Sequence, residues 1–434
     1  MTTPVNQIPI GALYGLPGYT EAVEQYDNMN NVQTAFQASA QTPFNAPGPL
    51  QKTDVVFWWE AEFLLSWALT FSAGVPALSP EAPYNWVQSP KLQLQGQYSP
   101  LECESGFDVS LFQLIRPMRG KGQRNIQDAL QTNVVPAGGF ANQQIPSANQ
   151  AASILTSAQG NNSTGVITSA SPVTSYPMIM EIPAGYFFDE YWDLAPDGSI
   201  LPNAQGVVAP MQAFVSPQYM GGGERNIVPN FKYASIVSGN YDEGPIALST
   251  ATALTASVET GSAILNMRRV GVFASENPAE MPPVFNWQYR RASRRQTFGN
   301  VTKVDIPIQE YGQVLMIFVR IFDPTLNGGN GGGYMNVTNI TVCRLVYGSN
   351  LPRFDDDMAA MQKRFIEQHG FTPPQGTVIW DLAATKLNAK VGNSGALNTL
   401  TNANCHVHLE FTSAPGAGTY AVVGTELLVP VAVQ

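Results

Sequence analysis

Charged residues are scarce in this chain of 434 residues. Asp, Glu, Lys and Arg make up 12% of it, about half the share that soluble proteins usually carry. Asn, Gln, Ser, Thr, Gly and Pro take their place, and such a surface limits repulsion between identical neighbouring copies. The formal net charge is −10 at pH 7, whereas proteins that bind nucleic acid usually show a basic surface. We therefore expect no sequence-specific nucleic-acid partner.

Cysteine, histidine and long apolar runs are also scarce. Cys103, Cys343 and Cys405 are far apart and form no CxxC pair, which indicates buried thiols in a reducing compartment. No apolar stretch reaches the ~18 residues that a membrane-spanning helix needs, and the first residues lack the basic start of a signal peptide. We expect a protein that is made and used in solution.

Three short patterns suggest chemistry, and each has a simpler explanation. Cys405, His406 and His408 could ligate a metal, but in a strand Cys405 points away from both histidines. The run 355–357 is three aspartates, and the favourable effect of negative charge at the start of a helix explains them better than a cation site. The glycines of 328–333 lack the Lys-Ser/Thr of a phosphate-binding loop. The sequence predicts no catalytic residues, metal or cofactor, and we expect no enzyme.

Strict alternation of apolar residues over Val55–Phe71, with Glu60 and Glu62 on the opposite face, predicts a long strand with one buried face. Similar patterns predict strands throughout the chain. The other predicted strands are Lys91–Gln97, Phe107–Ile115, Ser175–Ile182, Phe231–Val237, Ala263–Phe273, Val301–Ile308, Val314–Phe322, Val337–Val346, Gly376–Leu382, Cys405–Phe411 and Tyr420–Val429. This succession predicts two antiparallel β-sandwiches. The boundary is expected in the Thr/Ala/Ser-rich run near 250–262, and 142–174 is expected to be a long surface loop.

Two helices are expected. In the first 50 residues, Thr20 can cap an amphipathic helix whose apolar stripe packs on its own domain, on a neighbouring subunit or on a membrane. The stripe consists of Val23, Tyr26, Met29, Val32 and Phe36. The second helix begins at the three aspartates 355–357 and ends at Gly370. Its apolar stripe consists of Met358, Met361, Phe365 and Ile366.

One basic cluster stands out against the acidic chain. Arg290, Arg291, Arg294 and Arg295 lie within six residues, and like charges this close repel one another unless anions face them. A solvated loop is one explanation. The other is a contact with a neighbouring subunit or with the inner surface of an assembly, and for that contact the candidate residues are these four arginines with Val23, Tyr26, Met29 and Phe36.

The segment NVTNITVCRLVYGSNLPRFDDDMAAMQKRFIEQHG with FTPPQGTVIWDLA resembles part of the second barrel of double jelly-roll major capsid proteins of the tectivirus type. Residues 398–429 resemble the end of that barrel, and SPKLQLQGQYSPLECESGFDVSLF resembles the early strands of the first. The resemblance implies an all-β fold of two eight-stranded antiparallel jelly rolls, with one or a few short helices and long loops. It divides the chain into an arm (1–50), a first jelly roll (51–255) and a second (256–434).

The same resemblance implies a structural function. Three copies would form a pseudo-hexameric capsomer, and capsomers would tile an icosahedral virus shell over an internal membrane. The implied partners are further copies, penton or minor capsid proteins and lipid. The chain would be synthesised in the host cytoplasm and located in the virion. A different reading is a receptor- or carbohydrate-binding β-sandwich, such as a viral spike or lectin, with Trp58, Trp86, Trp192 and Trp287 as stacking residues.

Overall fold

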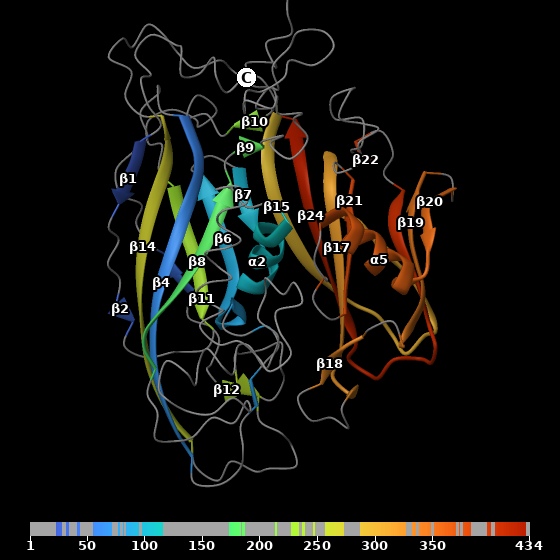
Figure 1. Cartoon of the computed structure of the whole chain (residues 1–434), viewed down its shortest axis with the longest axis horizontal. Coiled ribbons are helices and arrows are strands. Elements are labelled where there is room, and N and C mark those ends of the chain that lie inside the picture. Colours follow the sequence, from blue (N-terminus) through green and yellow to red (C-terminus); the bar gives the residue numbers. More distant parts are fainter. Residues whose placement is uncertain are drawn as a thin grey trace, which may run out of the picture.

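A computed structural model gives the fold of the chain, in which two β-rich halves stand side by side with their long strands running in a similar direction (Figure 1). The structure describes residues 23–27, 32–33, 41–43, 55–71, 77–78, 81, 84–94, 98–115, 173–183, 185–186, 213–214, 227–233, 237–238, 246–247, 257–272, 287–326, 332–335, 338–348, 351–369, 373, 376–382, 397–400 and 404–430. Side-chain surroundings are described within 81–113, at Met180 and within 290–429. The expected loop 142–174 lies outside these residues up to 172.

The first half contains a five-stranded sheet built on two long strands. Strand β4 (Val55–Phe71) pairs antiparallel with β14 (Ser257–Val272) from end to end. β8 (Val173–Pro183) pairs with the other edge of β4, and β1 (Val23–Asp27) and β2 (Val32–Gln33) pair with β14. The alternating pattern of β4 therefore predicted its type and both its ends correctly.

Because β14 pairs with β4, it belongs to the sheet of the first half. The boundary expected between residues 255 and 256 instead separates these two strands, which share sixteen register positions. The Thr/Ala/Ser-rich run overlaps the start of β14, and the division of the chain at this point stays a prediction.

The helix expected around Val23–Phe36 is wrong in its described part, because Val23–Asp27 and Val32–Gln33 are strands. Val23 pairs with Gly271 and Asp27 with Met267. A strand partner satisfies the backbone groups along the edge of β14, and this long-range pairing prevails over a helical spacing of apolar residues. Met29 and Phe36 lie outside the described residues.

A ten-stranded sheet runs through both halves. Its order is β18-β17-β24-β15-β7-β6-β11-β3, and β21 and β22 also pair with β17. The bounds are β3 Gln41–Pro43, β6 Val87–Leu94, β7 Tyr98–Glu102, β11 Ile227–Tyr233, β15 Trp287–Thr297, β17 Gln313–Asp323, β18 Gly333–Tyr334, β21 Thr377–Asp381, β22 Leu397–Asn398 and β24 Tyr420–Pro430. The sheet passes from the first half to the second where β7 pairs in parallel with β15.

The remaining short elements flank these sheets. Strands β12 (Val237–Ser238), β13 (Ile246–Ala247) and β5 (Ala77–Leu78) form a three-stranded sheet. β9 (Gly185–Tyr186) pairs with β10 (Ala213–Phe214), and a 3-10 turn, η1 (Tyr84–Trp86), precedes β6.

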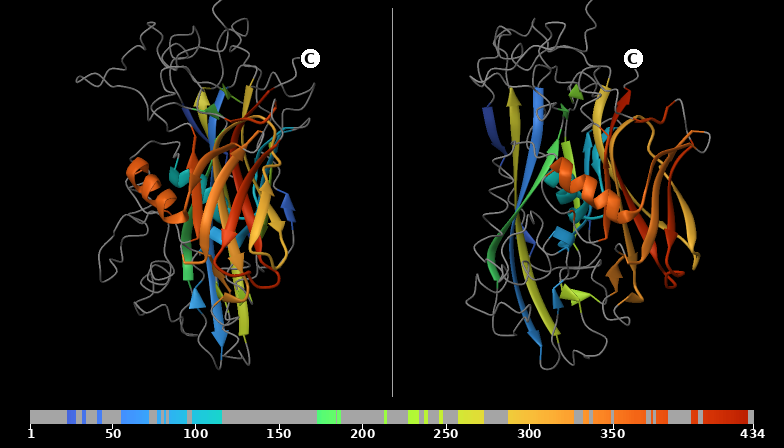
Figure 2. Two further views of the ribbon diagram at one scale, coloured as in Figure 1. Left: turned by 90° about the vertical axis from the view of Figure 1, so that its right-hand side faces the viewer. Right: turned by 45° about the vertical axis from the view of Figure 1, so that its right-hand side comes forward.

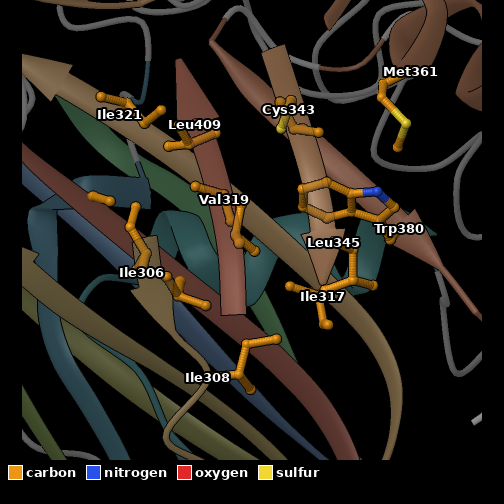
Figure 3. Close-up of a cluster of buried hydrophobic side chains, with 14 of the residues drawn as sticks. Ile306, Ile308, Ile317, Val319, Ile321, Cys343, Leu345, Met361, Trp380 and Leu409 are labelled. Carbon is orange, nitrogen blue, oxygen red and sulfur yellow. The ribbon is translucent and has the colours of Figure 1, made fainter. Parts of the chain in front are cut away.

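In the second half, a four-stranded sheet faces the strands β21-β17-β24-β15. Its order is β16-β23-β19-β20, with bounds β16 Lys303–Pro307, β19 Ile340–Tyr347, β20 Leu351–Asp356 and β23 Cys405–Phe411. Burial alternates along β23, so Val407 and Leu409 point inward while His406 and His408 are partly exposed. The buried side chains of both layers form one core, seen in Figure 3, with Ile317, Val319 and Trp380 among them.

Helix α2 (Gly106–Ile115) stands where the sequence predicted the strand Phe107–Ile115, and the reason lies at its first turn. The backbone N–H of Ser105 donates to Asp108 Oδ2 at 3.3 Å, and the N–H of Asp108 donates to Ser105 Oγ at 3.4 Å. These reciprocal bonds form a capping box with Asp in the acidic position. The Ser-x-x-Asp spacing was present in the sequence, but the apolar run that follows it suggested a strand.

Helix α5 (Met358–His369) confirms the second expected helix, and it lies on one flank of the second half (Figure 2). Only Asp357 caps it, since the N–H of Ala360 donates to Asp357 Oδ1 at 2.6 Å, while the preceding two aspartates belong to β20. Phe365 is buried, but Ile366 is 39% exposed. The predicted stripe is therefore wrong at Ile366. Within the described residues, no helix is long and apolar enough to cross a membrane.

Replacing Phe365 with Ala should lower the free energy of unfolding by about 3–5 kcal/mol, because the ring is 2% exposed and its removal leaves a cavity. Ile366→Ala is the matched control on the adjacent, exposed position and should cost about 1 kcal/mol or less. Urea denaturation of both variants measures the difference. Similar midpoints for the two variants would show that α5 does not pack as described.

Candidate functional site

The two halves meet along a surface that we call the seam. It consists of Glu81, the segment Cys103–Ser105 and α2 from the first half, facing β15, β17, β18 and β24 of the second. In Figure 1, α2 lies between the strands of the two halves. The rings of Phe112 on α2 and Phe318 on β17 are 5.0 Å apart between centroids. The guanidinium of Arg291 lies 5.4 Å from the Phe112 centroid, and that of Arg320 lies 4.8 Å from the Phe107 centroid. Aromatic rings from one half thus pack on arginines from the other.

Arg320 lies at the centre of the seam. It is 3% exposed and forms ion pairs with Glu81 and Asp108, both from the first half. It also donates to the Tyr334 hydroxyl at 3.1 Å, and that hydroxyl donates to Glu81. Burial alone would lower the pKa of Arg320, but the charges of Asp108 and Glu81 raise it well above its ordinary value. The guanidinium is therefore held in its charged form.

Ser293 on β15 links the seam to the segment before α2. Its hydroxyl donates to Asp108 Oδ2 at 2.7 Å and accepts the backbone N–H of Glu104 at 2.7 Å. Cys103 lies beside Ser293, and burial, with the charge of Asp108, raises the pKa of its thiol. Burial and Asp108 also raise the pKa of Glu104. A thiol held in its neutral form is a poor nucleophile, so Cys103 is a packing residue of the seam.

The four predicted arginines lie on strand β15, which rules out the solvated loop. They point to its two faces. Arg291 is fully buried and pairs with Glu426 at 3.1 Å, and Arg295 lies over the Tyr420 ring at 4.0 Å. On the opposite face, Arg290 and Arg294 contact acidic residues of the same chain.

That opposite face carries a network of partly exposed ion pairs across the two halves. Glu102 on β7 pairs with Arg290 at 3.1 Å, with Arg294 at 3.0 Å and with Lys91 at 3.5 Å. Glu310 adds pairs with Arg290 at 3.2 Å and Arg294 at 3.4 Å. Burial alone would raise the pKa of Glu102, but the hydrogen bond and charge of Arg294, with Lys91 and Arg290, bring it below its ordinary value. The pKa of Arg294 is raised by its hydrogen bond to Glu102.

The arginine cluster therefore finds anions within its own chain, which weakens the reason for expecting an external partner. Arg291 is 0% exposed and offers no surface for such a contact. For Arg290, Arg294 and Arg295, contact with a neighbouring subunit or an inner surface stays a prediction. The same holds for Val23 and Tyr26, whose side chains are not described.

Of the other candidates, the histidines of β23 lie beside acidic residues. His408 Nδ1 lies 2.6 Å from Asp305 Oδ1, and its Nε2 lies 3.2 Å from Glu410 Oε1. Hydrogen bonds from Lys303 and His408 lower the pKa of Glu410. Among the described residues, no group of three or more His, Cys, Asp and Glu could hold a metal ion. Residues 327–331 of the glycine-rich segment and Trp192 lie outside the description, and the side chains of Trp58, Trp86 and Trp287 are not described.

Sequence reasoning missed the acidic half of the seam. Glu81, Asp108 and Glu426 were not singled out, nor was Arg320. The available signal was a charged residue in the middle of a largely apolar strand, as for Arg320 in QVLMIFVRIFD and Glu426 in YAVVGTELLVP. Such charges are almost never fully buried unless paired, so each predicts an oppositely charged partner without saying where that partner lies.

The comparisons with known proteins address the fold. No family model and no curated protein matches the sequence. Among solved structures, the chain is similar to the major capsid protein of Sulfolobus turreted icosahedral virus (STIV), with 12% identity, 94% of this chain and 96% of that chain covered, and a TM-score of 0.53. An atomic structure of the same virus gives 11% identity, 93% and 90% coverage, and a TM-score of 0.50. The chain has the fold of double jelly-roll viral major capsid proteins.

A third solved structure, the major capsid protein P2 of bacteriophage PM2, has 9% identity, coverage of 94% of this chain and 98% of that chain, and a TM-score of 0.43. The likeness to the STIV structures confirms the double jelly-roll expectation at the level of the fold. In this chain the seam is the place where the two halves of that fold are joined.

Gly424 supports the packing of the seam. It lies opposite Phe318 in the β17–β24 register, and the Phe318 ring occupies the space that a side chain at 424 would need. Gly424→Ala should therefore lower the free energy of unfolding by about 1–3 kcal/mol through overpacking. Gly299→Ala is the control, because a Cβ there meets nothing within 4 Å. Equal thermal midpoints for both variants would contradict the described contact.

The opposed pKa shifts of Glu102 and Glu104 predict opposite pH effects. Glu102 has a folded pKa below 4.5, so the stability from its ion pairs is fully present above pH 4.5 and is lost as pH falls through the folded value. Glu102→Gln should lower the free energy of unfolding by about 1 kcal/mol or less at pH 7, and its stability should decline less steeply as pH falls.

Glu104 has a folded pKa above 4.5, so its contribution to the free energy of unfolding falls as pH rises. Glu104→Gln should therefore not destabilise the chain at pH 7. Chemical denaturation between pH 3 and 7 measures both, and a steeper acid decline in Glu102→Gln would refute the assignment.

Proposed function

We propose that the chain is a structural, non-enzymatic major capsid protein, whose copies form trimers that tile an icosahedral virus shell. The observation that carries the proposal is the likeness to the STIV major capsid protein, which spans 94% of this chain and 96% of that one. A match of this extent includes both halves and their connection. Two similar β-units in one chain allow a threefold trimer to present six similar edges, which suits a hexagonal array.

The strand order of the second half supports an eight-stranded jelly roll. Four strands, β21-β17-β24-β15, face four others, β16-β23-β19-β20, over a shared core. Two four-stranded antiparallel sheets with interleaved chain order fit the jelly-roll architecture. We propose the same plan for the first half, with the domain boundary between the end of β14 at Val272 and the start of β15 at Trp287.

The partners belong to the same proposal. They are further copies of the chain, penton or minor capsid proteins, and an internal lipid membrane beneath the shell. Arg294 and Arg295 remain accessible enough to contact a neighbouring subunit or lipid headgroups. The low charge content of the chain supports close approach between identical copies. The protein would reside in the virion after synthesis in the host cytoplasm.

Size-exclusion chromatography with light scattering tests the trimer. The expected mass is about 141 kDa, three times the 46.9 kDa of one chain. Electron microscopy of particles containing the chain should show pseudo-hexagonal capsomers, and the presence or absence of a bilayer beneath them tests the internal membrane. A stable monomer that binds glycans on an array would instead support the receptor- or carbohydrate-binding function.

A further inference from the structure

Each half of the chain builds its own framework. In the described part of the second half, every member of the buried core cluster lies within 306–427. Strand β17 shows how this core is kept apart from the seam, since Ile317 and Val319 point into the core while Phe318 faces the first half (Figure 3). The five-stranded sheet of the first half likewise contains only strands from 23–272. The seam is therefore a contact between two units and not part of either core.

The contacts of the seam are those of an interface between two proteins. Arg291 of the second half lies over the ring of Phe112, and Arg320 lies over the ring of Phe107. Arginine and aromatic side chains supply most of the binding energy in many protein–protein interfaces. Fully buried charges, in contrast, are rare inside a domain core. The seam thus has the residue types of a surface at which two folded units associate.

The seam also has a buried centre and a more exposed rim. At the centre, Arg320 is 3% exposed. At the rim, Glu102 pairs with Arg290 and Arg294, whose side chains are 22% and 35% exposed. Between centre and rim, β7 and β15 pair through their backbones. A desolvated centre surrounded by polar, partly exposed contacts is the arrangement found in stable protein–protein interfaces.

We propose that the seam is a self-sufficient association interface, at which the first half binds the second half without needing the peptide connection between β14 and β15. The partner that fits the seam surface of the second half is the first half of the same chain, up to Val272. The centre of the binding surface is Arg320, and its ligands are the carboxylates of Glu81 and Asp108. This inference concerns the single chain and does not rest on the proposed function.

The test is to cut the connection in the folded chain. A recognition sequence for a site-specific protease is inserted between Val272 and Trp287, and the purified full chain is cleaved under native conditions. Denaturing electrophoresis should then show two fragments, while light scattering after size exclusion at micromolar concentration gives the same mass as before cleavage. Fragments that elute separately would overturn the inference. If the inserted site resists the protease, the two fragments are produced together as separate chains, and their copurification or separation decides in the same way.

An arginine variant tests whether the charges hold the two halves together. Arg320→Met leaves the carboxylates of Glu81 and Asp108 facing an apolar side chain. These groups would lose water on association without gaining a partner, so the dissociation constant of the cut protein should rise roughly a hundredfold or more. Lys303→Met removes an ion pair with Glu410 on the outer sheet and should leave that constant unchanged. Native mass spectrometry of a dilution series measures both, and equal constants would contradict the role of Arg320.

A triple variant separates charge pairing from packing. Combining Arg320→Met with Glu81→Gln and Asp108→Asn removes every charge of the cluster. Removing one partner of a buried ion pair is costly, whereas replacing the whole group is often nearly neutral. The triple variant should therefore regain most of the affinity that Arg320→Met loses, and binding as weak as in the single variant would overturn the role assigned to the charges. Glu102→Gln, at the partly exposed rim, should raise the dissociation constant about fivefold at most.

The outcome is independent of assembly. If the cut halves stay paired in a complex with the mass of one chain, the inference holds and the proposed trimer is contradicted. If a trimer loses one of its halves on cleavage, the proposed function is retained and the inference is overturned. A variant that fails to fold before cleavage affects neither result, because cleavage of the unmodified chain decides between them.

Discussion

A guanidinium sealed between two β-units needs its carboxylates, and this requirement governs how the halves of the chain sit together. Arg320 is buried on β17, and its partners Glu81 and Asp108 lie on the other side of the seam. Misplacing either half would leave an unpaired charge in the interior, which costs about 3–5 kcal/mol. Apolar contacts such as Phe112 on Phe318 tolerate small shifts, whereas ion pairs at hydrogen-bond distance do not. We therefore expect the charged cluster to set the orientation of the two halves relative to each other. The aromatic contacts pack the space around it.

Local patterns in the sequence predicted the helices and strands whose apolar residues recur on a single face. The alternation in Val55–Phe71 gave both ends of β4, and that in Cys405–Phe411 gave β23 with its inward and outward residues. Asp357 and the apolar residues after it gave α5. In β23 the period of the chain and the buried side agree, so that short-range information suffices. The double jelly-roll plan came instead from the resemblance of segments in both halves to viral major capsid proteins, since the patterns alone predicted only two β-sandwiches.

The wrong predictions concern elements whose structure depends on contacts with segments far away in the sequence. The Val23–Asp27 segment has helical spacing but pairs with β14, more than two hundred residues later. β15 looked like a charged loop because its arginines conceal the alternation of a strand; their anions Glu102, Glu310 and Glu426 come from three other segments. The seam around Arg320 could not be predicted from the sequence for the same reason. A lone Arg320 in an apolar strand predicts an acidic partner, yet only the fold shows that Glu81 and Asp108 provide it.

The partners of Arg320 are also remote along the chain, with separations of 239 residues to Glu81 and 212 to Asp108. Closing loops of that length costs conformational entropy that only the finished contacts repay. During synthesis, the first half leaves the ribosome with both carboxylates hydrated, long before β17 exists. We therefore expect the seam to close late in folding, because Arg320 is synthesised more than two hundred residues after each of its carboxylate partners.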